Sequence, residues 1–197
     1  MKKTSLHIEH SLEQAYDYNA YKELITTLLA EGKSTSEGFG EQFVKYSELG
    51  LQRMQRWDKK FELSASQQEK AAAHTEKRIW LVIAEGWCGD AAHSVPVMHK
   101  IAQASDNIDF RVVLREKNLE LMNDFLTNGG KSIPKLIVYN PDAKTVEATW
   151  GPRPAGAKQI FEANRDGEWE VMEQKLQAWY NKDKGQTTAE ELMQLLK

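Results

Sequence analysis

The sequence of 197 residues contains a single cysteine, Cys88. One thiol makes no intramolecular disulfide, and it supplies too few ligands for a cysteine-based zinc site or an iron-sulfur cluster. Long apolar stretches are also missing, because the longest run, Ile79 to Ala84, has six residues, whereas a membrane-spanning helix needs about 18 or more. These absences exclude a disulfide-stapled secreted scaffold and a transmembrane protein.

An excess of charge of one sign is lacking as well. The chain has 26 Lys and Arg against 29 Asp and Glu, for a net charge of -3. Proteins that bind nucleic acids present clustered basic residues to the phosphates, so we expect no nucleic-acid partner. Two lysines follow the first methionine, but no apolar stretch of about 7 to 15 residues comes after them, as a secretory signal requires. We therefore expect a cytoplasmic protein without a membrane partner.

The first part of the chain is predicted to be helical. Ser11 with Gln14, and Ser66 with Glu69, have the spacing of capping boxes that begin helices. Between these pairs, apolar residues recur at helical spacing, interrupted by Gly50. The aromatic members of this stripe are Phe39, Phe43, Tyr46 and Trp57. We interpret the stripe as the face with which the helices pack on the rest of the protein.

The hydrophobic period then changes. Residues 79–84 are continuously apolar, which is typical of a strand buried on both faces, and residues 108–114 predict a second strand. Residues 135–139 and 145–150 predict an antiparallel pair around a turn. Helical spacing is found at residues 91–104, 119–126, 157–161 and 169–180. This order predicts an α/β fold, and Cys88 follows the first strand at its carboxyl end, where open α/β sheets place their sites.

The residues around the cysteine resemble the active centre of thioredoxins. The sequence WCGDA, Trp87 to Ala91, is similar to the thioredoxin centre Trp-Cys-Gly-Pro-Cys. Pro96 stands eight residues after the cysteine, like the proline inside the active-site helix of thioredoxins. The segment Ser132–Leu136 resembles the thioredoxin segment whose cis-proline, here Pro134, faces the catalytic sulfur. The resemblance extends over residues 77–179.

This resemblance implies a thioredoxin fold, with three layers α/β/α, a mixed central sheet and an N-terminal helical extension. We divide the chain into a helical extension packed on the core (1–76), a thioredoxin-like domain (77–182) and a short C-terminal helix (183–197). More narrowly, the chain resembles a bacterial thioredoxin-like subfamily that has such an extension, the WCGDA centre and the later segment WGPRP, Trp150–Pro154.

The centre departs from that of thioredoxins at two positions. Ala91 stands where thioredoxins have their second, resolving cysteine, and Asp90 replaces the proline between the two cysteines. Cys88 lies at a predicted helix start, where backbone N–H groups stabilise a thiolate. We therefore expect the pKa of Cys88 to lie below the ordinary value of about 8.5, with Asp90 offsetting part of the decrease.

A thiolate at Cys88 would attack a disulfide and form a mixed disulfide with its substrate. Without a second cysteine, an external thiol must release that substrate. We therefore expect thiol-disulfide exchange with Cys88 as the catalytic nucleophile. Reduction of a peroxide through a sulfenic acid, or stable capture of a client protein, would use the same thiolate.

The resemblance also implies which residues surround the sulfur. Trp87 would shield one side of it, and the backbone of Ile133 would pair with an extended substrate. Arg153 would hold an anionic group, with Arg115 on the same rim. The expected substrate-binding residues are Trp87, Gly89, Asp90, Ile133, Pro134 and Arg153.

Each of these residues also has a structural interpretation. Cys88 is then a buried, inert thiol, Arg153 a member of an ordinary ion pair and Asp90 a helix-start residue favoured by the dipole. His93 is a solvated helix residue in this interpretation, and a general base in the functional one. For the whole protein, the alternative to a redox protein is a non-catalytic binding or adaptor protein.

We expect no resident cofactor and no bound metal. His7 and His10 have a spacing that suits metal ligation, but we expect no third ligand to complete a site at this terminal position. The expected substrate is a protein disulfide or a small thiol, and a low-molecular-weight thiol would act as co-substrate. The oligomeric state does not follow from the sequence.

Overall fold

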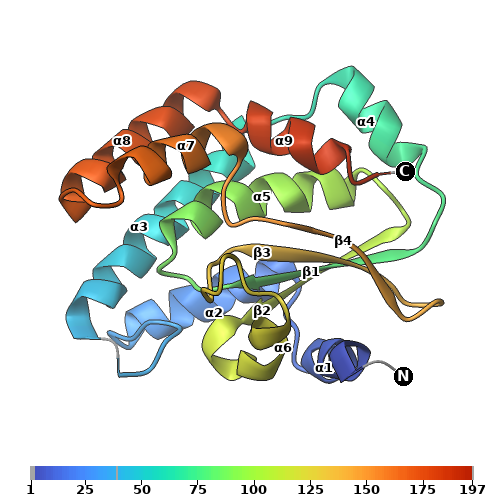
Figure 1. Cartoon of the computed structure of the whole chain (residues 1–197), viewed down its shortest axis with the longest axis horizontal. Helices are drawn as coiled ribbons and strands as arrows, with labels where there is room; N and C mark the ends of the chain where they lie inside the picture. Colours follow the sequence, from blue (N-terminus) through green and yellow to red (C-terminus); the bar gives the residue numbers. More distant parts are fainter. Residues whose placement is uncertain (1–2, 39, 197) are drawn as a thin grey trace.

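The computed structural model describes residues 3–38 and 40–196 and shows a mixed sheet between layers of helices (Figure 1). β1 runs parallel to β2 and antiparallel to β3, and β4 is antiparallel to β3, in the order β2-β1-β3-β4. The strands are β1 (Arg78–Ala84), β2 (Ile108–Leu114), β3 (Lys135–Asn140) and β4 (Thr145–Trp150). The predicted mixed α/β fold is confirmed, and each predicted strand boundary is correct to within one residue.

β1 is an interior strand of the sheet, and its side chains are buried on both faces. Trp80 and the four residues after it are 0% exposed. Val82 pairs with Val112 of β2 on one edge and with Leu136 of β3 on the other. Branched side chains suit such a doubly covered position. Because β1 is held on both edges, the loop that follows its carboxyl end and leads to Cys88 has a fixed position.

Helices cover both faces of the sheet. In Figure 1, α3, α5, α7, α8 and α9 lie on one side, and α1 and α6 lie on the other. α2 packs against α3 and against β2. The bounds are α1 Lys3–Leu12, α2 Tyr18–Ala30, α3 Gly40–Lys60, α4 Ala65–Ala72, α5 Gly89–Gln103, the 3-10 helix η1 Arg115–Lys117, α6 Leu119–Asp124, α7 Ala155–Asn164, α8 Trp169–Asp183 and α9 Gln186–Met193. None of the helices in the described ranges is long and apolar enough to cross a membrane.

Two predicted helix starts are wrong. α2 begins after Asp17, whose carboxylate accepts the backbone N–H of the third residue of the helix, whereas Ser11 is buried in the last turn of α1. A carboxylate also complements the positive end of the helix dipole, which a hydroxyl does not. The capping box of α4 is formed by Ser64 and Gln67, two residues before the predicted Ser66. An amide at the third helical position completes the box as a carboxylate would.

α3 runs through Gly50 without a break, although the sequence suggested an interruption there. The glycine is needed for packing, because a Cβ on Gly50 would lie 2.4 Å from the carbonyl oxygen of Gly86, in the loop that leads to Cys88. At helical spacing Tyr46, Arg53 and Trp57 share the face of Gly50. α3 therefore packs directly beside the predicted site; Phe39 of the predicted stripe lies outside the described residues.

This contact generates a prediction for Gly50→Ala. In an ordinary helix, the change stabilises by about 0.5–1 kcal/mol. Here the new methyl group meets backbone, so we expect the free energy of unfolding to fall by about 1–3 kcal/mol, the usual range for overpacking. Urea unfolding measures it. The control is Glu48→Ala at an exposed position of the same helix, and equal or greater stability of Gly50→Ala would show that the close approach is absent.

Candidate functional site

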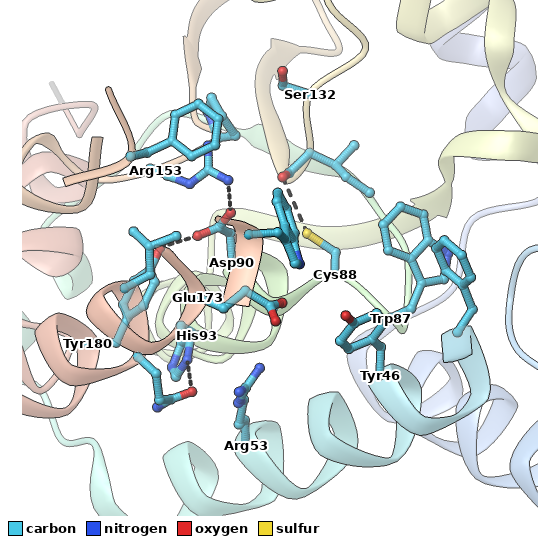
Figure 2. Close-up of a pocket in the computed structure, with 18 of the residues that line it drawn as sticks. Tyr46, Arg53, Trp87, Cys88, Asp90, His93, Ser132, Arg153, Glu173 and Tyr180 are labelled. Carbon is cyan, nitrogen blue, oxygen red and sulfur yellow. Dashed lines mark hydrogen bonds and ion pairs between the residues drawn. The ribbon is translucent and has the colours of Figure 1, made fainter. Parts of the chain in front are cut away.

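Cys88 is the N-cap residue of α5, directly after the loop that leaves β1. Its Sγ donates a hydrogen bond to the carbonyl oxygen of Ile133 at 3.4 Å, and the next peptide, Ile133–Pro134, is cis, as the resemblance implied. Cys88 is only 8% exposed. The dashed line at the labelled Cys88 in Figure 2 marks this hydrogen bond of the sulfur. The structure therefore brings Cys88, Ile133 and Pro134 together, with the thiol largely withdrawn from solvent.

The loop before Cys88 is held by the turn that follows α2. Glu85 is 1% exposed and accepts a hydrogen bond from the hydroxyl of Thr35. The same hydroxyl oxygen accepts the N–H of Gly86 at 3.0 Å. The indole N–H of Trp87 donates to Ser36 Oγ at 2.7 Å. These bonds fix the backbone and the indole next to Cys88, so the N-terminal helices contribute directly to the shape of the site.

Asp90 is the centre of a buried polar cluster. Its Oδ1 accepts a hydrogen bond from the Tyr180 hydroxyl at 2.8 Å, and its Oδ2 lies 2.6 Å from Nη2 of Arg153. The guanidinium of Arg153 also covers the ring of Phe161 at 3.9 Å. Both dashed contacts of Asp90 can be followed in Figure 2. Arg153 thus forms the ion pair of the structural interpretation, and its charge neutralises Asp90.

The segment that carries Arg153 lies against the cis-proline. Gly151 has φ +111°, a conformation that residues with a Cβ rarely adopt. A Cβ at Gly151 would lie 2.2 Å from the carbonyl oxygen of Pro134. The Gly151–Pro152 peptide is cis as well, which the sequence analysis did not predict. The glycine of the WGPRP segment therefore allows the close approach that brings Arg153 to Asp90.

The predicted decrease in the pKa of Cys88 is wrong. Burial, with the negative charge of Asp90 as the second cause, raises the pKa of Cys88 to about 12. The N–H groups of Ala91 and Asp90 and the charge of Arg153 act in the opposite direction, but they do not offset the loss of solvation. The sequence shows that Cys88 lies beside the N–H groups of a helix start, but it does not show how deeply the thiol is buried. The resting sulfur is therefore a protonated thiol at neutral pH.

A groove of about 750 Å³ opens beside the sulfur, between α3, α8 and the loops around Ile133 and Arg153 (Figure 2). Of the predicted residues, Pro134 is not among those that line it. The residues that line it are Gln42, Phe43, Tyr46, Arg53, Trp87, Cys88, Gly89, Asp90, His93, Arg115, Lys131, Ser132, Ile133, Pro152, Arg153, Phe161, Trp169, Glu173, Leu176, Gln177 and Tyr180. Its volume suits a small molecule or a short peptide segment.

His93 is neither solvated nor a base. It is 4% exposed, its Nδ1 accepts the indole N–H of Trp57 at 2.8 Å, and its ring stacks on Tyr180 with centroids 4.1 Å apart. Burial lowers the pKa of His93 to about 3, so the ring is neutral at physiological pH. It connects α3, α5 and α8 behind the cysteine.

Sequence reasoning missed the groove residues of α3 and α8. Arg53 and Glu173 carry charge into the groove, and Tyr180 binds Asp90. A signal existed for Arg53, because it shares the glycine face of α3 with Gly50. Nothing in the sequence indicated that α8 returns to the first turn of α5.

No cluster of three or more His, Cys, Asp or Glu side chains suited to a metal ion occurs within residues 3–38 and 40–196. The two histidines with metal-like spacing make different contacts. His7 lies 2.8 Å from a carboxylate oxygen of Asp124, and His10 lies 3.4 Å from Glu13.

The charge of Asp90 generates a prediction for Asp90→Asn. Because that charge disfavours the thiolate, its removal leaves Arg153 as an uncompensated cation near the sulfur, and we expect the pKa of Cys88 to fall. A decrease of about one unit gives roughly ten times more thiolate at pH 8. The measurement is the rate of iodoacetamide alkylation of Cys88 between pH 6 and 11, with circular dichroism to show that the variant is folded, because unfolding would also lower the pKa of the thiol.

The control for this profile is Glu173→Gln, which neutralises the other carboxylate of the groove. That variant should follow the wild-type profile, in which the rate rises about tenfold per pH unit below the pKa. An Asp90→Asn profile at the wild-type position, or at higher pH, would contradict the assigned role of Asp90.

Comparisons with known proteins agree with the fold. A family model described as Thioredoxin matches residues 37–170. No curated protein matches the chain. Among solved structures, an HIV epitope scaffold is similar with a TM-score of 0.58 at 12% identity, over 91% of this chain and 97% of that one. A Pseudomonas aeruginosa protein of unknown function is similar with a TM-score of 0.54 at 13% identity, over 91% and 96% of the two chains. These two likenesses concern the fold alone, and the family match over more than half of the sequence shows that the chain belongs to the thioredoxin family.

Proposed function

We propose that this protein performs thiol-disulfide exchange through Cys88 and that a thiol from another molecule completes each cycle. One observation carries the proposal: Cys88 Sγ lies at the first turn of α5, in the wall of the groove and 3.4 Å from the carbonyl that precedes Pro134. A sulfur with an adjacent cavity has room for a second sulfur atom, which a thiol enclosed in a core does not.

The proposed cycle balances without any other redox group. The Cys88 thiol loses its proton to solvent, and the thiolate attacks one sulfur of a substrate disulfide. The substrate S–S bond breaks, a new S–S bond forms to Cys88, and the other substrate sulfur leaves as a thiolate that takes up a proton. An external thiol, deprotonated in turn, attacks the substrate sulfur of the mixed disulfide. A new S–S bond joins the external thiol to the substrate, the bond to Cys88 breaks, and the Cys88 thiolate takes up a proton. Ala91 has no sulfur, so the second step is intermolecular.

Formation of the thiolate limits this chemistry. With a pKa of about 12, Cys88 supplies little thiolate at neutral pH, so the resting protein resists adventitious oxidation. Faster exchange requires that a bound substrate reduce the influence of Asp90 or increase the polarity around the sulfur. In this proposal, how readily Cys88 forms the thiolate is regulated by the cluster of Asp90, Arg153 and Tyr180.

We also propose a reducing compartment, the cytoplasm, as the place of action. A cycle that depends on an external thiol needs a compartment that maintains low-molecular-weight thiols. The narrower family assignment, to a bacterial thioredoxin-like subfamily with a WCGDA centre, is likewise a proposal. It is supported by the segments Trp87 to Ala91 and Trp150–Pro154.

The second candidate function is non-catalytic binding. It is favoured by the same burial that raises the pKa of Cys88, since a thiol 8% exposed is poorly placed to meet a large disulfide. In that case the groove recognises a partner, and the sulfur only contributes apolar contact.

Reaction with 2-hydroxyethyl disulfide distinguishes the two functions. For the folded wild type, we expect one mixed disulfide per chain, faster at pH 9 than at pH 7 and reversed by added thiol, as measured by intact mass. Cys88→Ser is the control and should remain unmodified. If Cys88 of the folded protein stays unmodified at pH 9 while the urea-unfolded chain reacts, exchange is excluded and the binding function is the correct one.

A further inference from the structure

The groove beside Cys88 is positively charged in a chain that is negative overall. Its described lining includes four cationic residues and two acidic ones, Asp90 and Glu173, whereas the whole chain has a net charge of -3. The cationic residues are Arg53, Arg115, Lys131 and Arg153. His93 adds no charge, because its pKa is about 3. Cations concentrated in a cavity with low-dielectric walls favour an anionic occupant.

Two of the arginines already have partners. Arg153 is paired with Asp90 at 2.6 Å. Arg115 is 2.6 Å from a carboxylate oxygen of Glu116 and lies over the ring of Trp87 at 5.1 Å. The charges of these two arginines are therefore partly offset within the wall of the groove, although the buried Nε of Arg153 donates no hydrogen bond to any described residue.

Arg53 differs from them, and it differs from the fourth cation, Lys131, which is exposed to solvent. Within the described ranges, no hydrogen bond and no ion pair is formed by its guanidinium; Glu173 and Asp90 act on it only through longer-range attraction. The side chain is half-buried, and burial is the main cause that lowers its pKa. A partly desolvated guanidinium without a partner gains more from an incoming carboxylate than a solvated one does.

The position of Arg53 relates it to the reacting sulfur. Its Nη1 would lie 3.2 Å from a Cβ on Gly89, the residue next to Cys88. Figure 2 shows the guanidinium rising from α3 into the pocket, toward the side on which Glu173 lies. A molecule whose sulfur meets Cys88 therefore needs only a short arm to place a carboxylate on Arg53.

We propose that the groove binds a low-molecular-weight thiol, or its disulfide, that carries a carboxylate, and that Arg53 is the residue that recognises this carboxylate. This inference rests on the proposed function and specifies its external thiol. A small molecule fits better than a protein client, since the sulfur is 8% exposed in the wall of a cavity of about 750 Å³.

The step that is tested is single exchange with a symmetrical disulfide. The Cys88 thiolate, after loss of its proton to solvent, attacks one probe sulfur. The probe S–S bond breaks, one half stays on Cys88 and the other half leaves as a thiol after protonation. Cys88 is thereby oxidised to the mixed disulfide, the probe half that it retains keeps its oxidation state, and the released half is reduced.

Three probes of similar size differ in charge: 3,3′-dithiodipropionate is anionic, 2-hydroxyethyl disulfide is neutral and cystamine is cationic. Each rate of mixed-disulfide formation is divided by the rate for the same chain unfolded in urea, which removes the intrinsic reactivity of the probe. We expect wild type to prefer the carboxylate probe over cystamine by roughly tenfold or more, as one charged hydrogen-bonded contact gives. The net negative charge of the protein alone would favour cystamine.

Arg53→Gln should lose this preference, and Arg53→Lys should keep part of it. Arg56→Gln is the matched control, because Arg56 lies on the same helix but is exposed and bound to Asn181 at 2.8 Å; it should behave as wild type. If Arg53→Gln does not fold, the wild-type preference is measured at different salt concentrations instead. Because salt screens the attraction between a guanidinium and a carboxylate, the preference should shrink between 0.05 and 0.5 M salt.

The outcomes separate the two proposals. If all three probes react with Cys88 without the carboxylate preference, or if Arg53→Gln or high salt leaves the preference unchanged, the role of Arg53 is wrong while exchange through Cys88 stands. If none of the probes reacts with the folded protein, the proposed function is wrong and this inference fails with it. A preference that depends on Arg53 and not on Arg56 supports both.

Discussion

The buried contact of Asp90 with Arg153 and Tyr180 is the constraint on which the site depends. It joins the first turn of α5 to the loop after β4 and to α8, and it places a negative charge two residues from the sulfur. Removal of one member of such a pair leaves a buried charge without compensation, which typically costs about 3–5 kcal/mol. The cluster therefore fixes one wall of the groove, and the charge of Asp90 adds to burial, which is the main cause that keeps Cys88 in the thiol form.

Much of the fold could be predicted from residue patterns. The apolar run of β1, the antiparallel pair β3 and β4, and the placement of Cys88 after the first strand follow from hydrophobic periodicity and turn residues. Helix starts were less predictable, because Asp17 and Ser64 compete as caps with Ser11 and Ser66, and the better cap depends on which side chains the fold buries. The local sequence contains several residues that could cap each helix, but it does not indicate which of them does so.

The chemistry of the site was predictable only in part. A cysteine at a helix start indicates a stabilised thiolate, but the dominant influence on Cys88 is the loss of solvent, and that depends on the packing of α3, α8 and two loops. Arg153 was expected to face a ligand, yet Asp90 binds it. The groove cation that forms no ion pair within the described residues is instead Arg53, which belongs to a helix more than thirty residues before Cys88 in the sequence. Which charged residues pair with each other depends on tertiary contacts, and a short sequence motif does not specify these contacts.

The central claim is that Cys88 turns over with an external thiol, and the most direct measurement is multiple-turnover catalysis. A small amount of the protein is added to 3,3′-dithiodipropionate and excess dithiothreitol, and the release of 3-mercaptopropionate is followed. We expect a rate above that of the uncatalysed reaction. This excess should be proportional to protein concentration and absent with Cys88→Ser. Equal rates for wild type and Cys88→Ser would contradict the claim.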